Sequence, residues 1–251
     1  MTQIDKARAF AALHVPGGPL VLFNAWDAGS ARAIAESGAQ AIGTSSSSVA
    51  MANGLPDGEE LPMEFALANA TRIVQSVELP VTVDFEGGYA ADPEEAAANV
   101  VRLAATGAAG CNFEDQVVGG AGLYPIIEQA KRIRALREAV GPDFFLNLRT
   151  DLFLKADAAS HDAALADAAI ERGHAYAEAG ASGFFIPGLG DLALVERICK
   201  AVSLPVNAMH FPGAPSRRQW ADAGIARISH GPFPHMDLMK QLTEMAREAV
   251  E

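Results

Sequence analysis

The stretch GAAGCNFED, residues 107–115, contains in short form the features that recur along the whole chain. Gly107 follows an alanine-rich segment of helical spacing, and a glycine at that place accepts the left-handed conformation that ends a helix. Residues 110–113 are a short, mostly apolar run, typical of a buried strand, and Glu114 and Asp115 follow them directly. The stretch therefore predicts a helix end, a buried strand and an acidic strand end, in that order.

The same pattern recurs on both sides of this stretch. Glycines at positions 38, 107, 180 and 224 each separate a helical segment from a following strand. Leu79-Pro80-Val81 is also echoed by Leu204-Pro205-Val206, and each leads from a helix into a strand. The expected strands are residues 20–24, 41–44, 81–84, 110–113, 144–148, 183–186, 206–208 and 226–229, and the clearest helical segments are residues 28–36, 64–77, 94–105, 127–140 and 164–179.

Strands separated by single helices are typical of βαβ units, whose strands form a parallel sheet. Eight such units in 251 residues predict an α/β fold, a single-domain (β/α)8 barrel of the TIM type spanning residues 1–251. An open, doubly wound sheet is the alternative, but no GxGxxG motif follows the first strand.

The composition argues against several classes of protein. The formal net charge is −12 and there is no basic run, so a nucleic-acid partner is not expected. No run of about 18 apolar residues occurs, so no membrane partner is expected either. Residues 1–16 have the pattern of an amphipathic helix and lack the apolar core of a secretion signal, which predicts a soluble, cytoplasmic protein.

Polar side chains gather where the predicted strands end, which is where barrels of this type carry their chemistry. Asp84, Glu86, Glu114 and Asp115 follow two neighbouring strands, and carboxylates crowded in this way need a cation. Oxygen ligands suit a hard ion such as Mg²⁺. Arg149, at the end of the next strand, offers a planar fork that matches a carboxylate. Together, the carboxylates and Arg149 predict a site that binds a small anionic substrate between a metal ion and an arginine.

Each of these residues also has a structural interpretation. An acid at a strand end often caps the next helix or pairs with an arginine, so the prediction depends on the conjunction over successive strands. The serine run, residues 45–48, either supplies anion-binding N–H groups or forms a flexible turn. His210 and His230 fall at the correct rim but are equally compatible with a structural role.

Several ordered motifs are similar to those of one enzyme superfamily. The chain resembles the isocitrate lyase/phosphoenolpyruvate mutase superfamily over roughly residues 20–232. The motifs that carry the resemblance are FNAWDAGSAR at 23–32, TSSS at 44–47, GLPDGE at 54–59, VDFEGGY at 83–89, NFEDQ at 112–116, LRTD at 148–151 and IPGL at 186–189.

The resemblance implies a barrel that holds Mg²⁺ and a pyruvate-like unit, and that makes or breaks a bond beside a carbonyl. By position, Asp84, Glu86 and Glu114 match the metal-site acids of the superfamily. Ser45 and Ser46 match the residues that hold the substrate carboxylate, and Arg149 matches the carboxylate-binding arginine.

The groups that would act during the reaction are less narrowly defined. Asp57 matches an acid near the metal and the substrate. Tyr89, His210 or a metal-bound water are the candidate proton donors, and Asn207 at the end of the seventh strand is a candidate substrate-binding residue. Lyases of the superfamily typically carry a Lys-Lys-Cys-Gly-His or Lys-Arg-Cys-Gly-His loop after the fourth strand. Residues 117–125 occupy that place here and contain no Cys, Lys or His.

The leading hypothesis is a Mg²⁺-dependent lyase that cleaves a C–C bond in a small 2-oxo or 2-hydroxy acid through an enolate-like intermediate. Oxaloacetate-like and malate-like skeletons are the natural candidates, because a decarboxylation tolerates the missing cysteine. The alternatives are a phosphonopyruvate-type C–P hydrolase and a barrel that binds a 2-oxo acid with little turnover. The resemblance also implies a homo-oligomer, a dimer or tetramer, in which the C-terminal helix of residues 236–251 is used.

Overall fold

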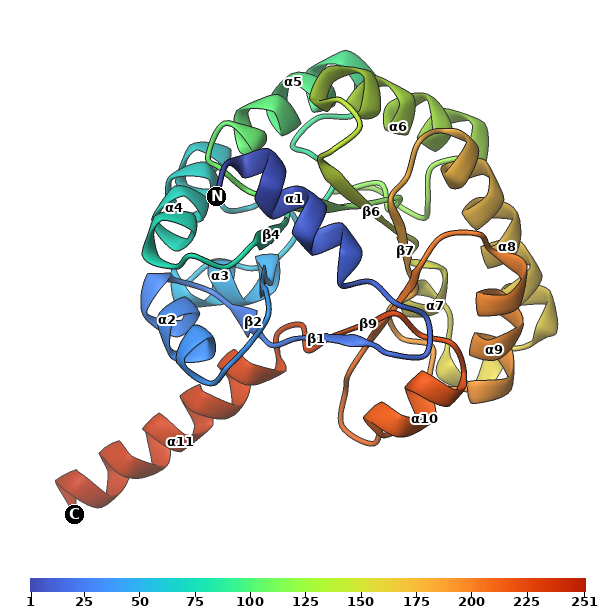
Figure 1. The fold of residues 1–251 in the computed structure, drawn as a ribbon. Coiled ribbons are helices and arrows are strands. Elements are labelled where there is room, and N and C mark those ends of the chain that lie inside the picture. Colours follow the sequence, from blue (N-terminus) through green and yellow to red (C-terminus); the bar gives the residue numbers. More distant parts are fainter.

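The computed structural model describes all 251 residues and contains one sheet of nine parallel strand segments surrounded by helices (Figure 1). The first segment, β1 (Leu20–Leu22), pairs with the last, β9 (Arg227–Ser229), and β2 (Asn24–Ala25) pairs with β3 (Ile42–Thr44). Because Phe23 alone separates β1 from β2, they are two parts of one strand, and the sheet closes on itself. The predicted (β/α)8 barrel is confirmed, with its first strand interrupted.

The remaining strands lie within one or two residues of the predicted ranges. They are β4 (Val81–Asp84), β5 (Gly110–Glu114), β6 (Phe145–Arg149), β7 (Gly183–Phe185) and β8 (Val206–Met209). The helices are α1 (Gln3–Ala12), α2 (Ala28–Glu36), α3 (Ser46–Ala52), α4 (Met63–Ser76), α5 (Pro93–Ala104), α6 (Ile126–Val140), α7 (Leu152–Lys155), α8 (Ala163–Glu178), α9 (Leu192–Ala201), α10 (Arg217–Asp222) and α11 (Phe233–Val250), with a short 3-10 turn, η1 (Ala158–Ser160), before α8.

The four junction glycines act as predicted. Gly38, Gly107, Gly180 and Gly224 have φ angles of 88°, 92°, 102° and 93°, in the left-handed region that ends a helix. Each helix therefore stops at a defined residue, and the following strand enters the barrel from the same side. This regularity places all strand C-termini at one mouth of the barrel.

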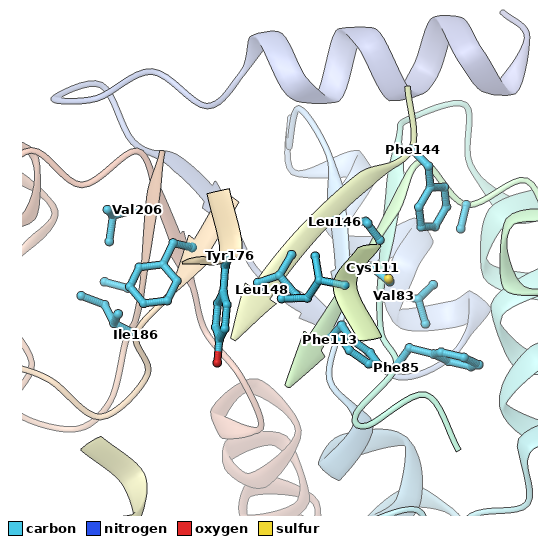
Figure 2. Packing of buried hydrophobic residues seen from close by; sticks show 14 of the residues in the cluster. Val83, Phe85, Cys111, Phe113, Phe144, Leu146, Leu148, Tyr176, Ile186 and Val206 are labelled. Carbon is cyan, nitrogen blue, oxygen red and sulfur yellow. The ribbon is translucent and has the colours of Figure 1, made fainter. Parts of the chain in front are cut away.

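The main apolar core lies between the sheet and the ring of helices. Side chains that point outward from neighbouring strands, such as Val83, Cys111, Phe113 and Leu146, pack against the helices in one cluster of 41 buried residues (Figure 2). Successive side chains of a strand point to opposite faces. The alternate residues of the same strands therefore face the barrel interior, where the polar side chains are found.

Helix α1 lies across one mouth of the barrel (Figure 1). Phe10 of this helix packs against Leu20, Ala109 and Phe145, which lie at or just before the N-terminal ends of their strands. Gln3 Nε2 donates to the carbonyls of Ala104 and Ala108, 2.7 and 2.8 Å away. With this mouth closed, a ligand must enter from the C-terminal ends of the strands.

Helix α11 projects from the barrel at the opposite end of the chain (Figure 1). Only Pro234 and His235 of this helix are buried. Apolar side chains along the rest of it are exposed, among them Leu238, Leu242 and Met245. No helix of the protein combines the length and the apolar character needed to cross a lipid bilayer.

Candidate active site

A polar cavity of about 170 Å³ lies at the C-terminal ends of the strands. Five of the predicted site residues line it: Ser45, Ser46, Asp57, Asp84 and Arg149. A water molecule takes up about 30 Å³ of liquid, so the cavity has room for an acid of a few carbon atoms. The other polar side chains along its wall are Asn24, Thr44, Ser47, Asn112 and Ser229.

Asp84, at the end of β4, is the most connected carboxylate of this wall. Its Oδ2 accepts hydrogen bonds from Ser46 N at 3.2 Å and Ser46 Oγ at 3.0 Å, and its Oδ1 accepts from Asn112 Nδ2 at 3.2 Å. The backbone N–H of Asp84 also donates to Thr44 Oγ1 at 2.9 Å. These contacts come from the two strands on either side of β4, namely β3 and β5, so the orientation of Asp84 is set before any ligand binds.

The serine run forms an ordered helix start instead of a flexible turn. Ser45 is the N-cap of α3, and its Oγ accepts from Ser48 N at 3.3 Å. A serine at the N-cap satisfies one of the N–H groups that the first helical turn leaves unpaired. The run therefore fixes Ser46 against Asp84 and leaves the hydroxyl hydrogen of Ser45 free to donate.

Glu86 is 5% exposed and lies two residues beyond the end of β4. Its Oε2 accepts from the N–H groups of Gly58 and Glu59 at 3.0 and 2.7 Å. Burial raises the pKa of Glu86 to about 8, and the nearby charges of Asp57, Asp84 and Glu114 add to the effect. The carboxyl groups of this rim thus repel one another when all are ionised.

Arg149 lies at the end of β6 between two buried acids. Its Nη1 is 2.8 Å from Glu114 Oε2, and its Nε and Nη2 donate to the two carboxylate oxygens of Asp151. Burial lowers the pKa of Arg149, but the charges of Glu114 and Asp151 outweigh it, and the net shift is upward. Asp151, to which the sequence assigned no role, therefore orients the predicted carboxylate-binding arginine.

Glu114 is 1% exposed, lies against Arg149 and does not line the cavity. Its Oε1 accepts a hydrogen bond from Gln116 Nε2. Its Oε2 makes no hydrogen bond, although Arg149 is close enough to form an ion pair with it. Burial raises the pKa of Glu114 to about 8; Arg149 opposes this shift, whereas Asp151 and Asp84 add to it.

Asp115 does not join the other carboxylates, which corrects the expectation of a four-acid cluster. It follows Glu114 directly, so its side chain points to the opposite face of the strand. Its Oδ2 accepts from Tyr176 Oη at 2.7 Å and from Arg172 Nη1 at 3.1 Å, and its Oδ1 accepts from Asp151 N at 2.9 Å. Asp115 ties the strand ends to α8 outside the barrel.

Asp57 reaches the cavity from the loop between α3 and α4. The residue as a whole is exposed, but its carboxyl group lies close to Asp84 and Ser46. Partial removal of that carboxyl from solvent raises its pKa, and the charge of Asp84 raises it further. The hydrogen bond from Ser46 and the charge of Arg149 act in the opposite direction.

Five predicted site residues do not line this cavity: Glu86 and Glu114, described above, and Tyr89, Asn207 and His210. The ring of Tyr89 packs beside Phe85 with ring centres 5.2 Å apart, and lines two smaller neighbouring cavities. Asn207 is buried in the barrel and donates to Ser229 Oγ at 3.3 Å. His210 lines a separate cavity of about 390 Å³ together with His230. The side chains that the structure gathers around one space are therefore Ser45, Ser46, Asp57, Asp84 and Arg149.

Arg227, on β9, lies in the barrel interior and was not predicted as a site residue. Its Nη2 donates to Asn112 Oδ1 at 3.3 Å and its Nε donates to Ser229 Oγ at 3.1 Å. Burial lowers its pKa to about 9, while the charge of Asp84 opposes that shift. The sequence signal was available, because an arginine inside a predicted buried strand needs polar partners.

The residues present fit a Mg²⁺ ion that keeps part of its water shell. No three His, Cys, Asp or Glu side chains converge closely enough to enclose an ion by themselves. Asp57, Asp84, Glu86 and Glu114 nevertheless repel one another, and Glu114 Oε2 has Arg149 as its only partner. Mg²⁺ commonly binds through one or two carboxylates and several waters, which is compatible with this looser arrangement.

The chain is a closed (β/α)8 barrel, and a cavity lined by acids and an arginine lies at the C-terminal ends of its strands. Enzymes of the TIM-barrel class have this architecture. A family model for phosphoenolpyruvate phosphomutase matches residues 10–250. The chain belongs to this family.

Individual relatives agree with that assignment. The structure of a Burkholderia cenocepacia J2315 protein, provisionally named a phosphonomutase, is 44% identical to this chain, with a TM-score of 0.95 over 98% of this chain and 99% of that one. The 2-methylisocitrate lyase of Escherichia coli K12 is 31% identical over an alignment covering 86% of this chain and 74% of the lyase. An oxaloacetate decarboxylase of a Marinomonas species is 25% identical, with coverage of 98% and 86%.

Proposed function

We propose that the protein is a Mg²⁺-dependent lyase that cleaves a C–C bond in a small 2-oxo or 2-hydroxy acid, with an oxaloacetate-like or malate-like skeleton. The observation that carries the proposal is the small cavity that Arg149, Asp57 and Asp84 line together. An arginine and a cation-binding acid that line one small cavity suit a substrate that carries a carboxylate next to a carbonyl. Relatives named as a 2-methylisocitrate lyase and an oxaloacetate decarboxylase support this class of reaction.

Side chains in and beside the cavity divide the work in this scheme between binding the substrate and holding the metal. The guanidinium of Arg149, held by Asp151, donates to the substrate carboxylate, and the hydroxyl of Ser45 donates to the same group. Asp84, Glu86 and Glu114 would hold Mg²⁺ directly or through water, with Asp84 kept in position by Ser46. Bound Mg²⁺ would polarise the carbonyl and stabilise the negative charge that develops as the C–C bond breaks.

Asp57 is the best-placed proton donor among the residues of this wall. Its carboxyl group lines the cavity, and its raised pKa keeps it protonated to a higher pH than an ordinary aspartate. Residues 117–125 contain no Cys, Lys or His that could act instead. A decarboxylation needs no base to begin, which fits a site with so few proton-transferring groups.

Phosphonate cleavage is the second candidate reaction. It would require a cationic group near the phosphonate in addition to the one that binds the carboxylate. Arg149 is the only cation among the side chains that line the cavity, so this reaction is disfavoured.

Turnover of a substrate panel tests the proposal. Oxaloacetate, a malate series and phosphonopyruvate would be incubated with the protein in Mg²⁺ and in excess chelator, with pyruvate and phosphate release followed separately. We expect metal-dependent pyruvate release from a C4 or C5 acid and no phosphate release. Phosphate release would favour the C–P hydrolase, and binding of these acids without any turnover would favour a ligand-binding barrel.

The raised pKa of Glu86 predicts how Mg²⁺ stabilises the protein at different pH values. The metal-free folded state holds the Glu86 proton up to a pKa of about 8, against 4.5 for an ordinary glutamate. The unfolded state therefore binds fewer protons between these values, and metal-free stability falls as pH rises, by at most about 1.4 kcal/mol per pH unit. A cation that pairs with Glu86 and Asp84 removes this penalty.

We therefore expect the gain in Tm on adding Mg²⁺ to be larger at pH 8.5 than at pH 6. Thermal unfolding with and without Mg²⁺ at both pH values measures this difference. Glu86→Gln should flatten the pH dependence of the metal-free protein in the same range. An equal gain in Tm at both pH values would argue against a cation among these acids.

We also propose that the protein is a homo-oligomer in which α11 packs on a second copy of the chain. The apolar side chains of Leu238, Leu242 and Met245 recur at helical spacing and are 45%, 55% and 66% exposed. A groove of about 740 Å³ lined by apolar residues of β1 and α2, such as Val21 and Ile34, opens beside the start of α11. An apolar stripe and an apolar groove on the same chain are complementary in a symmetric assembly.

Leu242→Glu should convert the oligomer into monomers, because it places a charge in the buried contact. Light scattering coupled to gel filtration gives the mass of each variant. Glu244→Gln, a polar change on the same helix, is the matched control and should leave the mass unchanged. A wild-type protein that is monomeric at all concentrations would contradict the proposal.

A further inference from the structure

Three non-glycine residues of the chain have a positive φ angle: Glu59 at 61°, Glu86 at 50° and Tyr89 at 57°. Side chains with a Cβ avoid this region, and such residues persist only where the surrounding structure holds them. Glu59 lies in the loop between α3 and α4, and the other two lie in the turn after β4. Strain in two separate loops is therefore confined to residues at one place in the fold.

These three residues are joined by hydrogen bonds in both directions. The N–H of Glu59 donates to Glu86 Oε2 at 2.7 Å, and the N–H of Gly58 donates to the same oxygen at 3.0 Å. In return, the N–H of Tyr89 donates to Glu59 Oε1 at 2.8 Å. Each loop thus supplies one carboxylate to the backbone of the other, and we call this pair of contacts the clasp.

Arg132 of α6 holds the turn of the clasp from the helix layer. Its guanidinium is stacked between the rings of Phe113 and Tyr124, 4.6 and 4.4 Å from their centres. Its Nη2 donates to the carbonyls of Gly87 and Ala90 at 2.6 and 2.8 Å. The turn is therefore held on both sides, by Glu59 from the neighbouring loop and by Arg132 from the helix layer.

Gly87, between Glu86 and Tyr89, leaves little room for movement inside the clasp. A Cβ at this position would lie 3.1 Å from Glu59 Oε1 and 3.0 Å from Val118 Cγ2. The turn thus packs closely against the carboxylate that holds it and against the segment that follows β5.

We propose that Glu59 is a positioning residue for the active site. Its carboxylate fixes the loop that carries Asp57 to the turn that carries Glu86, so that both acids face the strand ends before a ligand arrives. This role rests on the proposed function, because Asp57 and Glu86 serve the metal and the substrate there. Groups that are already held in position need no rearrangement during the reaction. The strained backbone of the two loops is the cost of holding these acids in position.

Two variants and a control test this role. Glu59→Ala removes the acceptor for the Tyr89 amide, whereas Glu59→Gln keeps an oxygen at the same reach. Glu60→Ala, an exposed acid next in sequence, is the matched control. Circular dichroism and Tm first establish that each variant is folded.

Amide hydrogen exchange of the ligand-free proteins is the first measurement. We expect exchange of the Tyr89 and Gly58 amides to be at least about tenfold faster in Glu59→Ala, because closing the clasp protects both. Glu59→Gln and Glu60→Ala should remain near wild type. Unchanged exchange of these amides in Glu59→Ala would overturn the proposal whatever the protein binds.

Calorimetric titration of oxalate in the presence of Mg²⁺ is the second measurement. We expect affinity to fall at least about tenfold in Glu59→Ala and to be largely restored in Glu59→Gln. Equal loss in both variants, or no loss in either, would overturn the positioning role. If the wild-type protein does not bind oxalate at all, the proposed function fails, and hydrogen exchange alone then decides whether the clasp exists.

Discussion

Arg149→Lys is expected to weaken Mg²⁺-dependent binding of oxalate by about 100-fold, or about 2.7 kcal/mol. Lysine keeps the positive charge but loses the planar fork that contacts a carboxylate with two parallel hydrogen bonds. Lysine also cannot replace every contact that Arg149 makes with the protein. Asp151 accepts hydrogen bonds from two nitrogens of Arg149, and Glu114 is paired with the third nitrogen. Isothermal titration of oxalate into wild type and variant measures the effect.

Lysine is chosen because full removal of the charge confounds binding with folding. Arg149→Ala would leave the buried Glu114 and Asp151 without their cation, and breaking a buried ion pair in this way costs about 3–5 kcal/mol of stability. Arg134→Lys, on the exposed face of α6, is the matched control and should bind oxalate like wild type. Wild-type affinity in Arg149→Lys would mean that another group binds the carboxylate.

Asp84→Asn is expected to abolish the Mg²⁺-dependent binding of oxalate and to weaken Mg²⁺ binding by about 100-fold or more. The amide has the shape of the carboxylate and can keep part of its contact with Ser46 and Asn112, so the fold should be retained. The variant removes the one acid that lines both the main cavity and the small neighbouring cavity next to Glu86. Hard cations bind charged oxygens far better than neutral ones.

Mg²⁺ titration monitored by the shift in Tm gives the affinity of this variant. Glu94→Gln, an exposed acid at the start of α5, removes the same charge elsewhere and should leave Mg²⁺ binding unchanged. An Asp84→Asn protein that binds Mg²⁺ as tightly as wild type would place the ion away from this strand end.

The fold was predictable because its signals are local. The helix-ending glycines and the short apolar runs each act within one βα unit, and repetition of the unit defines the barrel. The break at Phe23 was not predictable, because it depends on the first strand leaving β9 and joining β3. The helix formed by the serine run was also ambiguous, since serine is common both in turns and at helix starts.

The site was predictable where it depends on strand ends and less so where it depends on loops. Asp84 and Arg149 follow directly from parallel strands that end at one rim. The prediction grouped Asp115 with the other acids because it follows Glu114 directly. Side chains alternate along a strand, so Asp115 points away from the barrel interior. Tyr89 and His210 lie on loops, and their directions depend on backbone paths that composition does not reveal.

The clasp shows the same limit more clearly. No local preference would place Glu59, Glu86 and Tyr89 in left-handed conformations, because both residue types avoid them. Their conformation is imposed by contacts between loops that are about 30 residues apart in sequence. Such strain is visible only in three dimensions, and it marks the part of the site that the surrounding structure constrains most.

The most direct test of the proposed metal and carboxylate site is calorimetric titration of oxalate into metal-stripped protein, with and without Mg²⁺. Oxalate is a small planar dianion that mimics the enolate of a 2-oxo acid and fits a cavity of about 170 Å³. The proposed site predicts tight binding with Mg²⁺, none without it, and loss of binding in Asp84→Asn. Oxalate binding that is equal with and without Mg²⁺ would contradict a cation site among these carboxylates.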